Sequence, residues 1–408
     1  MAEQHEKALV PQIRFTGFTD PWEQRKLGEL TEIKDSARIP NRLWREAGVP
    51  YIRASDISQE DLRGALFIDE EDYAAYKAAT GAPEKGDVLF NGGGEIGKAI
   101  INGNSSPIYV QGGAVLYARI AHSSLLDARY LVAAFVTQNV VNAIGVLSAG
   151  GTMKHFTLQP AKNLPIEVPS IAEQRRIGAF FDRLDSLITL HQRKYDKLCV
   201  LKKSMLDKMF PKGGSLYPEI RFAGFTDPWE QRKLGEVAPL QRGFDLPVSQ
   251  MISGPYPVVM SNGVGGWHSK YAVKGPGVVT GRSGTIGGLQ YIEGDFWPHN
   301  TSLWVTSFNG NEPKFIYWLY SSMNLERFGS GSGVPTLNRN DVHDQLIGVP
   351  CNIAEQRQIG AFFDCLDSLI TLHQRKYCGV ASWMLGVALV RLGSESDGAF
   401  GEMKHVLR

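Results

Sequence analysis

One segment of this chain occurs twice, almost letter for letter. Residues 171–195 read IAEQRRIGAFFDRLDSLITLHQRKY, and residues 353–377 read IAEQRQIGAFFDCLDSLITLHQRKY, so the copies differ at two positions. A second pair lies upstream of each copy, with PQIRFTGFTDPWEQRKLGEL at 11–30 and PEIRFAGFTDPWEQRKLGEV at 218–237. The period is far too long for a solenoid repeat. The chain therefore predicts two whole domains of one plan, joined by near-identical connectors.

The repeats divide the 408 residues into variable and constant parts, and this length suits two or three domains. The expected parts are a first variable domain at 1–168 with a clip at 11–30, a first constant helix at 169–212, a second variable domain at 213–352 with a clip at 218–237, a second constant helix at 353–392 that diverges after 377, and a tail at 393–408.

Short apolar runs bounded by turn residues indicate strands in both variable parts. Helical patterns accompany them in the first part, at 72–79 and 125–144. In the clip, Asp20 is placed as a helix N-cap with Pro21 at the first helical position, which predicts a short helix there. The fold class expected is α+β, with two similar domains whose curled sheets are mainly antiparallel.

Apolar residues recur at spacings of three and four in both constant helices, which is typical of a coiled-coil seam. These residues are Ile177, Phe180, Leu184, Leu187, Leu198, Leu201 and Met205 in the first copy, and Ile359, Phe362, Leu366 and Leu369 in the second. His191 and Lys194 interrupt the seam. A helix of about 57 Å with one apolar face needs a partner helix. We therefore expect the two copies to pair as long antiparallel coiled-coil helices with pseudo-two-fold symmetry between the domains.

Catalytic and cofactor motifs are missing from the sequence. The run Gly92–Lys98 imitates a phosphate-binding loop, but Ala99 stands where that motif needs Ser or Thr, and a strand-like segment follows instead of a helix. No zinc-ligand spacing, GxSxG motif or base-flipping NPPY motif occurs. The four cysteines show no CxxC pairing, so we expect free thiols in a reducing cytosol. These features predict a recognition chain with no metal site.

Small polar and basic residues cluster at matching turns of the two variable parts. Such residues suit DNA, because amides and guanidinium groups read base edges while Lys and Arg bind phosphates. The candidates are Arg53, Ser55, Asn91, Lys98, Lys154 and His155 in the first part, and Arg242, Ser261, Asn262, Arg282, Ser283, His299, Asn300 and Arg339 in the second. A solvated loop or a cap is an equally good interpretation of any one of them. The net charge of +1 permits local binding of this kind.

The whole pattern resembles the specificity subunits of type I restriction–modification systems, the HsdS family. The resemblance covers residues 11–377 and is carried by the two clips, by the EQRRIGAFFDRLDSLITLHQRKY helix with its DKLCVLKKSMLDKMFPK continuation, and by the GRSGTIG and SGSGVPTLNRND turns. It implies two target recognition domains, each reading one half of a split DNA sequence. It also implies a chain without catalytic activity or cofactor.

The same resemblance implies partner proteins. Two modification (HsdM-like) subunits would dock on the constant helices and methylate adenine with S-adenosylmethionine. Two restriction (HsdR-like) subunits would supply ATP-driven, Mg-dependent DNA translocation and cleavage. We expect a cytoplasmic location with no membrane association.

The second copy departs from this pattern after Tyr377. It continues CGVASWMLGVALVRLGSESDGAFGEMKHVLR, which matches neither the first copy nor the family. Gly379 and Gly386 each weaken a helix by about 1 kcal/mol relative to Ala. We therefore expect weaker assembly with modification subunits. Two other functions stay open at this point, a self-contained enzyme that fuses recognition with methylation or cleavage, and a duplicated scaffold that does not bind DNA.

Overall fold

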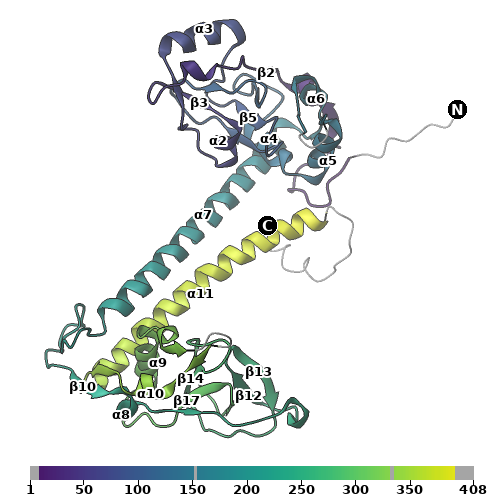
Figure 1. The fold of residues 1–408 in the computed structure, drawn as a ribbon. Coiled ribbons are helices and arrows are strands. Elements are labelled where there is room, and N and C mark those ends of the chain that lie inside the picture. Colours follow the sequence, from purple (N-terminus) through teal and green to yellow (C-terminus); the bar gives the residue numbers. More distant parts are fainter. Residues whose placement is uncertain (1–8, 151–153, 331–334, 391–408) are drawn as a thin grey trace. The chain divides into compact units, whose positions relative to one another are not determined.

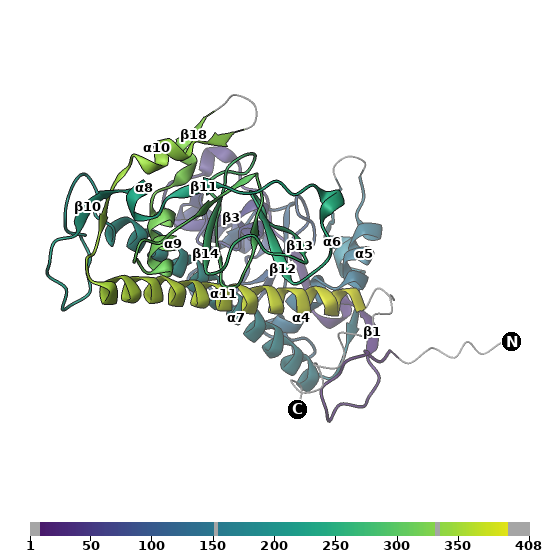
Figure 2. The ribbon, with the colours of Figure 1, turned by 90° about the horizontal axis from the view of Figure 1, so that it is seen from below.

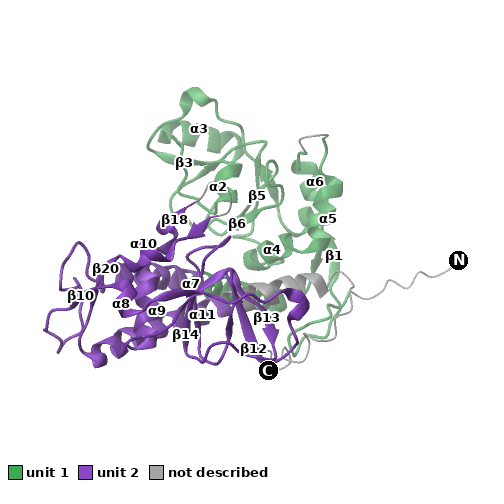
Figure 3. Ribbon diagram, turned by 60° about the horizontal axis from the view of Figure 1, so that its bottom comes forward, with its two compact units in different colours: residues 1–190, 377–408 green, residues 191–376 purple. Residues whose placement is uncertain are grey.

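The computed structural model describes residues 9–150, 154–330 and 335–390, with residues 377–390 described by their backbone alone. The chain divides into two compact units, which Figure 3 colours separately. Unit 1 comprises residues 1–190 and 377–408, and unit 2 comprises residues 191–376. The tail predicted at 393–408 lies outside the described residues.

Unit 1 combines a four-stranded antiparallel sheet, of order β2-β8-β5-β6, with a three-stranded sheet, of order β4-β3-β7, in which β3 and β7 are parallel. Its strands are β1 (Glu23–Lys26), β2 (Ile33–Asp35), β3 (Val49–Ile52), β4 (Phe67–Ile68), β5 (Val88–Asn91), β6 (Ala99–Ile101), β7 (Tyr109–Val110), β8 (Val115–Ala118) and β9 (Pro165–Val168). Its helices are α1 (Leu27–Leu30), η1 (Asn41–Leu43), α2 (Ala54–Ser58), α3 (Glu70–Thr80), α4 (Ala128–Phe135), α5 (Gln138–Leu147) and α6 (Leu158–Lys162).

Unit 2 repeats this plan, with a four-stranded sheet of order β11-β17-β14-β15 and a three-stranded sheet of order β13-β12-β16, in which β12 and β16 are parallel. Its strands are β10 (Glu230–Lys233), β11 (Leu240–Arg242), β12 (Tyr256–Met260), β13 (Gly263–His268), β14 (Gly277–Gly281), β15 (Leu289–Ile292), β16 (Trp297–Pro298), β17 (Ser302–Val305), β18 (Gly329–Ser330), β19 (Thr336–Leu337) and β20 (Leu346–Val349). Its shorter helices are α8 (Leu234–Val237), η2 (Val248–Gln250), α9 (Pro313–Ser322), η3 (Leu325–Phe328) and α10 (Arg339–His343).

The two units therefore share one sheet topology, although their variable sequences differ. The helix α9 packs on strands β14 and β15 of its sheet, and Figures 1 and 2 show it beside β14. All paired strands of both units are antiparallel except β3 with β7 and β12 with β16. This arrangement confirms the prediction of two similar α+β domains with mainly antiparallel sheets.

The clips form strands, so the helix predicted at Asp20 and Pro21 is wrong. Residues 23–26 form β1, which pairs antiparallel with β9, and β10 pairs in the same way with β20. Only the four residues of α1 after this strand are helical. The partner strand lies far away in the sequence, and its backbone groups bind β1 more effectively than a local cap could stabilise a helix.

The helix predicted at 125–144 is also interrupted. It consists of α4 and α5, which are bent by 73° at Val136 and Thr137. The Thr137 hydroxyl donates to the Ala134 carbonyl at 2.8 Å, which satisfies an acceptor that the helix end leaves open. No single described helix is long and apolar enough to span a membrane, although this bent pair passes the same test by length and composition.

Two long helices, α7 (Ile171–Lys208) and α11 (Ile353–Val390), carry the repeated sequence (Figure 1). Inside unit 2 they run antiparallel, because His191 meets His373 while Lys202 bonds to Asp367. The predicted pairing of the two copies is confirmed over this stretch.

The start of each long helix docks on its own unit through identical residues. Gln174 accepts from the Asp127 backbone N–H at 2.9 Å and donates to two carbonyl groups. Gln356 accepts from the Glu312 backbone N–H at 2.8 Å in the same manner. Because these glutamine side chains are buried, their hydrogen bonds fix the direction in which each helix leaves its unit.

The clip completes this docking with an ion pair and two rings. Arg14 bonds to Glu173 at 2.7 Å in unit 1, and Arg221 bonds to Glu355 at 2.7 Å in unit 2. Phe15 and Phe222 stand edge-on to the rings of the helix residues Phe180 and Phe362, with both pairs of ring centroids within 6 Å. The repeated sequences are thus the parts that attach each unit to its helix.

Candidate nucleic-acid interface

Turns of unit 2 meet at one end of its sheets, around Thr301. The Thr301 carbonyl accepts hydrogen bonds from the backbone N–H groups of Arg282 at 2.9 Å and Ser283 at 3.2 Å. The Thr301 hydroxyl accepts from the Ser261 backbone N–H at 3.3 Å and lies 3.0 Å from Nδ1 of His299. These contacts bring together the turns that follow β12, β14 and β16, so candidate residues from distant parts of the sequence share one place.

The basic side chains at this end of unit 2 differ in whether they are already paired. Arg242 donates to Asp245 at 3.1 Å and to the Asn300 carbonyl at 3.4 Å, and the Asn300 amide also donates to Asp245. Arg282 and Arg339 form no side-chain hydrogen bond or ion pair with the residues that the structure describes. Their donors remain available to a ligand.

The hairpin of β18 and β19 closes the same end of unit 2. The Leu337 backbone N–H donates to the Arg282 carbonyl at 2.7 Å, and Ser283 forms an isolated bridge with Thr336. Asn262 is exposed in the turn between β12 and β13. The hairpin therefore adds backbone and side-chain groups from a further part of the sequence.

Unit 1 has the same junction, built from different residues. The Ala114 carbonyl, in the place of the Thr301 carbonyl, accepts from the backbone N–H groups of Gly92 at 2.9 Å and Gly93 at 3.3 Å. The Gly92 carbonyl in turn accepts from the Phe156 backbone N–H at 2.8 Å. A Cβ atom on Gly92 would lie 2.6 Å from the Phe156 carbonyl oxygen, so this turn requires glycine.

Asn91 and Arg53 lie beside this junction but are engaged within the protein. Asn91 is buried, and its amide donates to the Ala54 carbonyl at 3.0 Å and to the Ser58 hydroxyl at 3.2 Å. Arg53 is the N-cap of α2 and bonds to Asp56 at 3.2 Å. Because Asn91 is buried and its amide is already bonded within the protein, it holds the turn in place.

The remaining candidates of unit 1 are closer to solvent. Lys98 bonds to Glu60 at 2.7 Å, and Ser55 lies exposed in α2. Lys154 and His155 are exposed on the segment that leads into the junction. The loop at 92–98 continues into strand β6, as the sequence predicted, and not into the helix that a phosphate-binding loop needs.

Two features of this region were not predicted. Thr301 organises the junction of unit 2, and the sequence signalled it only through its neighbours His299 and Asn300. Trp267 is 54% exposed on β13, whereas Trp318 is buried in the core of unit 2. Trp267 lies on the edge strand β13, whose other residues include three glycines without side chains to cover the ring.

The helix pairing in unit 2 uses part of the predicted seam. Leu198 and Met205 pack against the core cluster that contains Ile359 and Leu366, and Phe362 packs at its margin. Leu206 joins them, although it was not predicted. The turn-by-turn drift of the helix brings Leu206 inward.

Three predicted seam residues are exposed in the free chain, so they stay a prediction. They are Leu187, Leu201 and Leu369, each about two-fifths exposed. Lys202 takes the inward position next to Leu201, where it bonds to Asp367. Ile177, Phe180 and Leu184 lie half-buried on the part of α7 that belongs to unit 1.

Comparison with known proteins gives the family. Residues 19–199 and 226–380 match the model of the type I restriction modification DNA specificity domain, once in each repeat. The EcoprrI type I restriction enzyme specificity subunit of Escherichia coli is 21% identical over 350 residues, which span 82% of this chain and 84% of that protein.

A second relative matches over a shorter stretch. The provisionally named MjaX type I restriction enzyme specificity subunit of Methanocaldococcus jannaschii is 24% identical over 229 residues, which span 53% of this chain and about half, 52%, of that protein. Among solved structures, the S subunit of a type I restriction–modification system from M. genitalium has a similar fold, with a TM-score of 0.57 and 15% identity over 93% of this chain and 97% of that chain.

The double match spans most of the sequence, and it falls on the two units whose topologies agree. The chain therefore belongs to the family of type I restriction–modification DNA specificity domain proteins.

Proposed function

We propose that this chain is the specificity subunit of a type I restriction–modification complex and that each unit reads one half of a bipartite DNA sequence. The observation that carries the proposal is the shared junction. Around Thr301 in unit 2 and Ala114 in unit 1, equivalent turns meet with the same backbone hydrogen bonds but with different side chains. One scaffold with two sets of side chains suits two different half-sites.

In unit 2 the base-reading groups are the guanidinium of Arg282, the amide of Asn262 and the imidazole of His299, with Arg339 on a phosphate. A guanidinium without a protein partner can bind O6 and N7 of guanine with two parallel hydrogen bonds. In unit 1 the corresponding groups are Lys98, Lys154 and His155. Arg242, Asn300 and Arg53 support the turns through the contacts that they already make with Asp245 and Asp56.

The chain has no catalytic role in this proposal. Two modification subunits methylate adenine with S-adenosylmethionine, and two restriction subunits use ATP and Mg for cleavage. The repeated clips and helix starts support two equivalent docking faces, because identical partners need identical surfaces. Antiparallel helix copies also suit half-sites about one DNA turn, or roughly 34–36 Å, apart. The complex works in the cytoplasm, where the DNA is.

A footprint of DNA by the chain together with its modification subunit tests the proposal. We expect two protected sequences separated by an unspecified spacer of fixed length. A single contiguous footprint, or protection that shows no sequence preference, would contradict it. Methylation by the purified chain with S-adenosylmethionine alone would instead identify a self-contained enzyme.

A further inference from the structure

Identical side chains on the two repeated helices have different surroundings. In unit 2, Ile359, Phe363 and Leu366 of α11 are 2%, 0% and 5% exposed. Their counterparts on α7 in unit 1, three residues of the same types at the same repeat positions, are only half-buried. They are Ile177, Phe181 and Leu184. Because the residues are identical, the difference in their exposure must come from the segments that pack over them.

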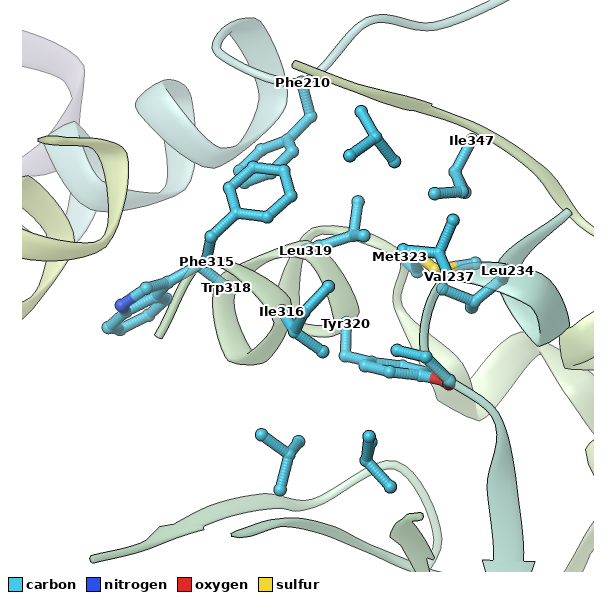
Figure 4. Packing of buried hydrophobic residues seen from close by; sticks show 14 of the residues in the cluster. Phe210, Leu234, Val237, Phe315, Ile316, Trp318, Leu319, Tyr320, Met323 and Ile347 are labelled. Atoms are coloured by element: carbon cyan, nitrogen blue, oxygen red, sulfur yellow. The ribbon is translucent and has the colours of Figure 1, made fainter. Parts of the chain in front are cut away.

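In unit 2 the cover is the second half of α7 and the residues after it. Met209 and Phe210 are buried in the core cluster of unit 2, and Leu198 and Met205 pack against that cluster. The Phe210 ring lies beside Phe315 of α9, as Figure 4 shows, with the two ring centroids 5.8 Å apart. Its centroid is 6.2 Å from that of Phe363. The segment 196–212 therefore closes the apolar face of the α11 helix.

An ion pair also stabilises the contact between segment 196–212 and α11. Lys202 Nζ lies 2.5 Å from an Asp367 carboxylate oxygen and 4.6 Å from the centroid of the Trp318 ring. The counterpart of Asp367 in unit 1 is Asp185, which takes part in no ion pair among the residues whose side chains the structure describes. Partial desolvation and then the nearby Glu60 carboxylate raise the pKa of Asp185, and Lys98 offsets them only in part. An approaching cation would relieve both effects.

The second copy of the repeat does not carry the residues of this cover. The positions that hold Leu198, Lys202, Met205, Met209 and Phe210 in the first copy hold other residues in the second. In the same order they are Val380, Met384, Val387, Arg391 and Leu392. The lysine that would meet Asp185 and the aromatic ring that would meet Phe181 are thus both replaced.

We propose that the face of unit 1 formed by Ile177, Phe181, Leu184 and Asp185 is a docking site for an amphipathic helix of the same chemistry as residues 196–212, supplied by another polypeptide. The helix presents a lysine to Asp185 and a Met-Phe pair to Phe181. A second copy of this chain is a poorer source, because its own 196–212 segment is already held in unit 2 by the buried Phe210.

A synthetic peptide with the sequence 196–212, fluorescein-labelled and with Cys199→Ser, tests the site by fluorescence anisotropy with the full chain. We expect saturable binding. The peptide with Phe210→Ala should bind more than tenfold more weakly, because it loses a buried aromatic ring. The peptide with Lys202→Asp should bind about fivefold more weakly, and the chain variant Asp185→Lys should restore its affinity.

Two matched variants keep this test specific. If the charge-reversed peptide recovers on Asp367→Lys and not on Asp185→Lys, the peptide enters unit 2 and the proposal fails. A chain in which residues 378–394 are replaced by the sequence of 196–212 should cover the face itself and bind no peptide. Unchanged binding to that chain, no binding to the native chain, or a homodimer in light scattering at the same concentrations would each overturn the proposal.

Discussion

Arg282 is the residue of unit 2 with the clearest opportunity to read a base. Its backbone is fixed at the Thr301 junction, while its guanidinium has no partner among the described residues. Arg242 stands at the same end but is held by Asp245. Arg282 and Arg242 can therefore be compared directly, since the guanidinium of Arg282 is available to a ligand and that of Arg242 is bonded to Asp245.

Arg282→Ala should weaken specific DNA binding by the assembled complex by about 1–3 kcal/mol and relax specificity in one half-site only. Arg242→Ala serves as the control and should change affinity much less. Competition binding with targets mutated in each half measures both effects. A larger loss from Arg242→Ala than from Arg282→Ala would contradict this assignment.

Glu355 lies at the centre of the clip in unit 2. It accepts from Arg221 at 2.7 Å and from the Trp229 indole N–H at 3.2 Å. Glu355→Ala should therefore cost about 3 kcal/mol in the free energy of unfolding of unit 2, since the largely buried Arg221 loses its counter-ion. Urea unfolding followed by tryptophan fluorescence gives the value.

The matching change Glu173→Ala in unit 1 should cost about 1 kcal/mol less. Glu173 pairs with Arg14, but the indole N–H of Trp22 has no hydrogen-bond partner among the described residues, so one contact fewer is lost. Equal losses for the two variants would show that the indole contact contributes nothing.

His191 and His373 form a pH-sensitive contact between the long helices. Their Nδ1 atoms are 3.0 Å apart, and burial, then His373, then Lys376 and Lys194 lower the pKa of His191. The unfolded histidine, with a pKa of about 6.5, therefore binds more protons than the folded one. Stability should be fully present above about pH 6.5 and fall as the pH drops below it.

Melting curves between pH 8 and pH 5.5 measure this dependence. In the variant His191→Gln the loss below pH 6.5 should be smaller than in the native chain. A melting temperature that rises on acidification, or the same profile in both proteins, would rule out the histidine pair as its source.

At the residue scale, the sequence showed which turns carry polar and basic side chains, but it did not show which of these side chains are already bonded within the protein. Equivalent turns carry polar and basic groups, but the Asn91 amide bonds to Ala54 of α2 and the Arg53 guanidinium bonds to Asp56. Such contacts depend on which turns meet in space. The sequence contains no local signal for that, and it therefore did not identify Thr301.

The long helices were the most predictable elements, because repeated spacing of apolar residues is a local signal. The clip was less predictable, because β1 exists only through its pairing with β9, far along the chain. In the helix pair of unit 2, Lys202 lies at the inward position and its neighbour Leu201 is exposed. A lysine can lie there because its ammonium group meets both Asp367 and the Trp318 ring.

Lys202→Met copies into the first helix the residue found at the same position of the second. It should destabilise unit 2 by about 1 kcal/mol, since the ion pair is part-exposed and screened. The control Lys203→Met removes an exposed lysine one position away and should be close to neutral. Urea unfolding of both variants compares them, and equal stabilities would exclude a specific role for Lys202.

At the scale of the whole molecule, duplication explains why one chain carries two recognition units. The clips and helix starts that attach each unit to its long helix are nearly identical in the two copies, whereas the junction turns carry different side chains. The exception is the sequence after Tyr377, where the second helix no longer matches the first.

We expect this departure to weaken assembly. A chain that carries the 196–212 sequence in place of 378–394 should bind modification subunits more tightly than the native chain, as co-purification and analytical ultracentrifugation would show. The native chain with Arg282→Ala is the control, because that change leaves the helices untouched. Equal assembly of the grafted and native chains would mean that the departure has no consequence for docking.

Methylome sequencing of a host that expresses this chain with its modification subunit tests the central claim most directly. The account predicts one new methylated motif, made of two specified half-sites separated by an unspecified spacer of fixed length, and Arg282→Ala should alter one half alone. A contiguous motif, or a change in both halves from that single substitution, would contradict the assignment of one half-site to each unit.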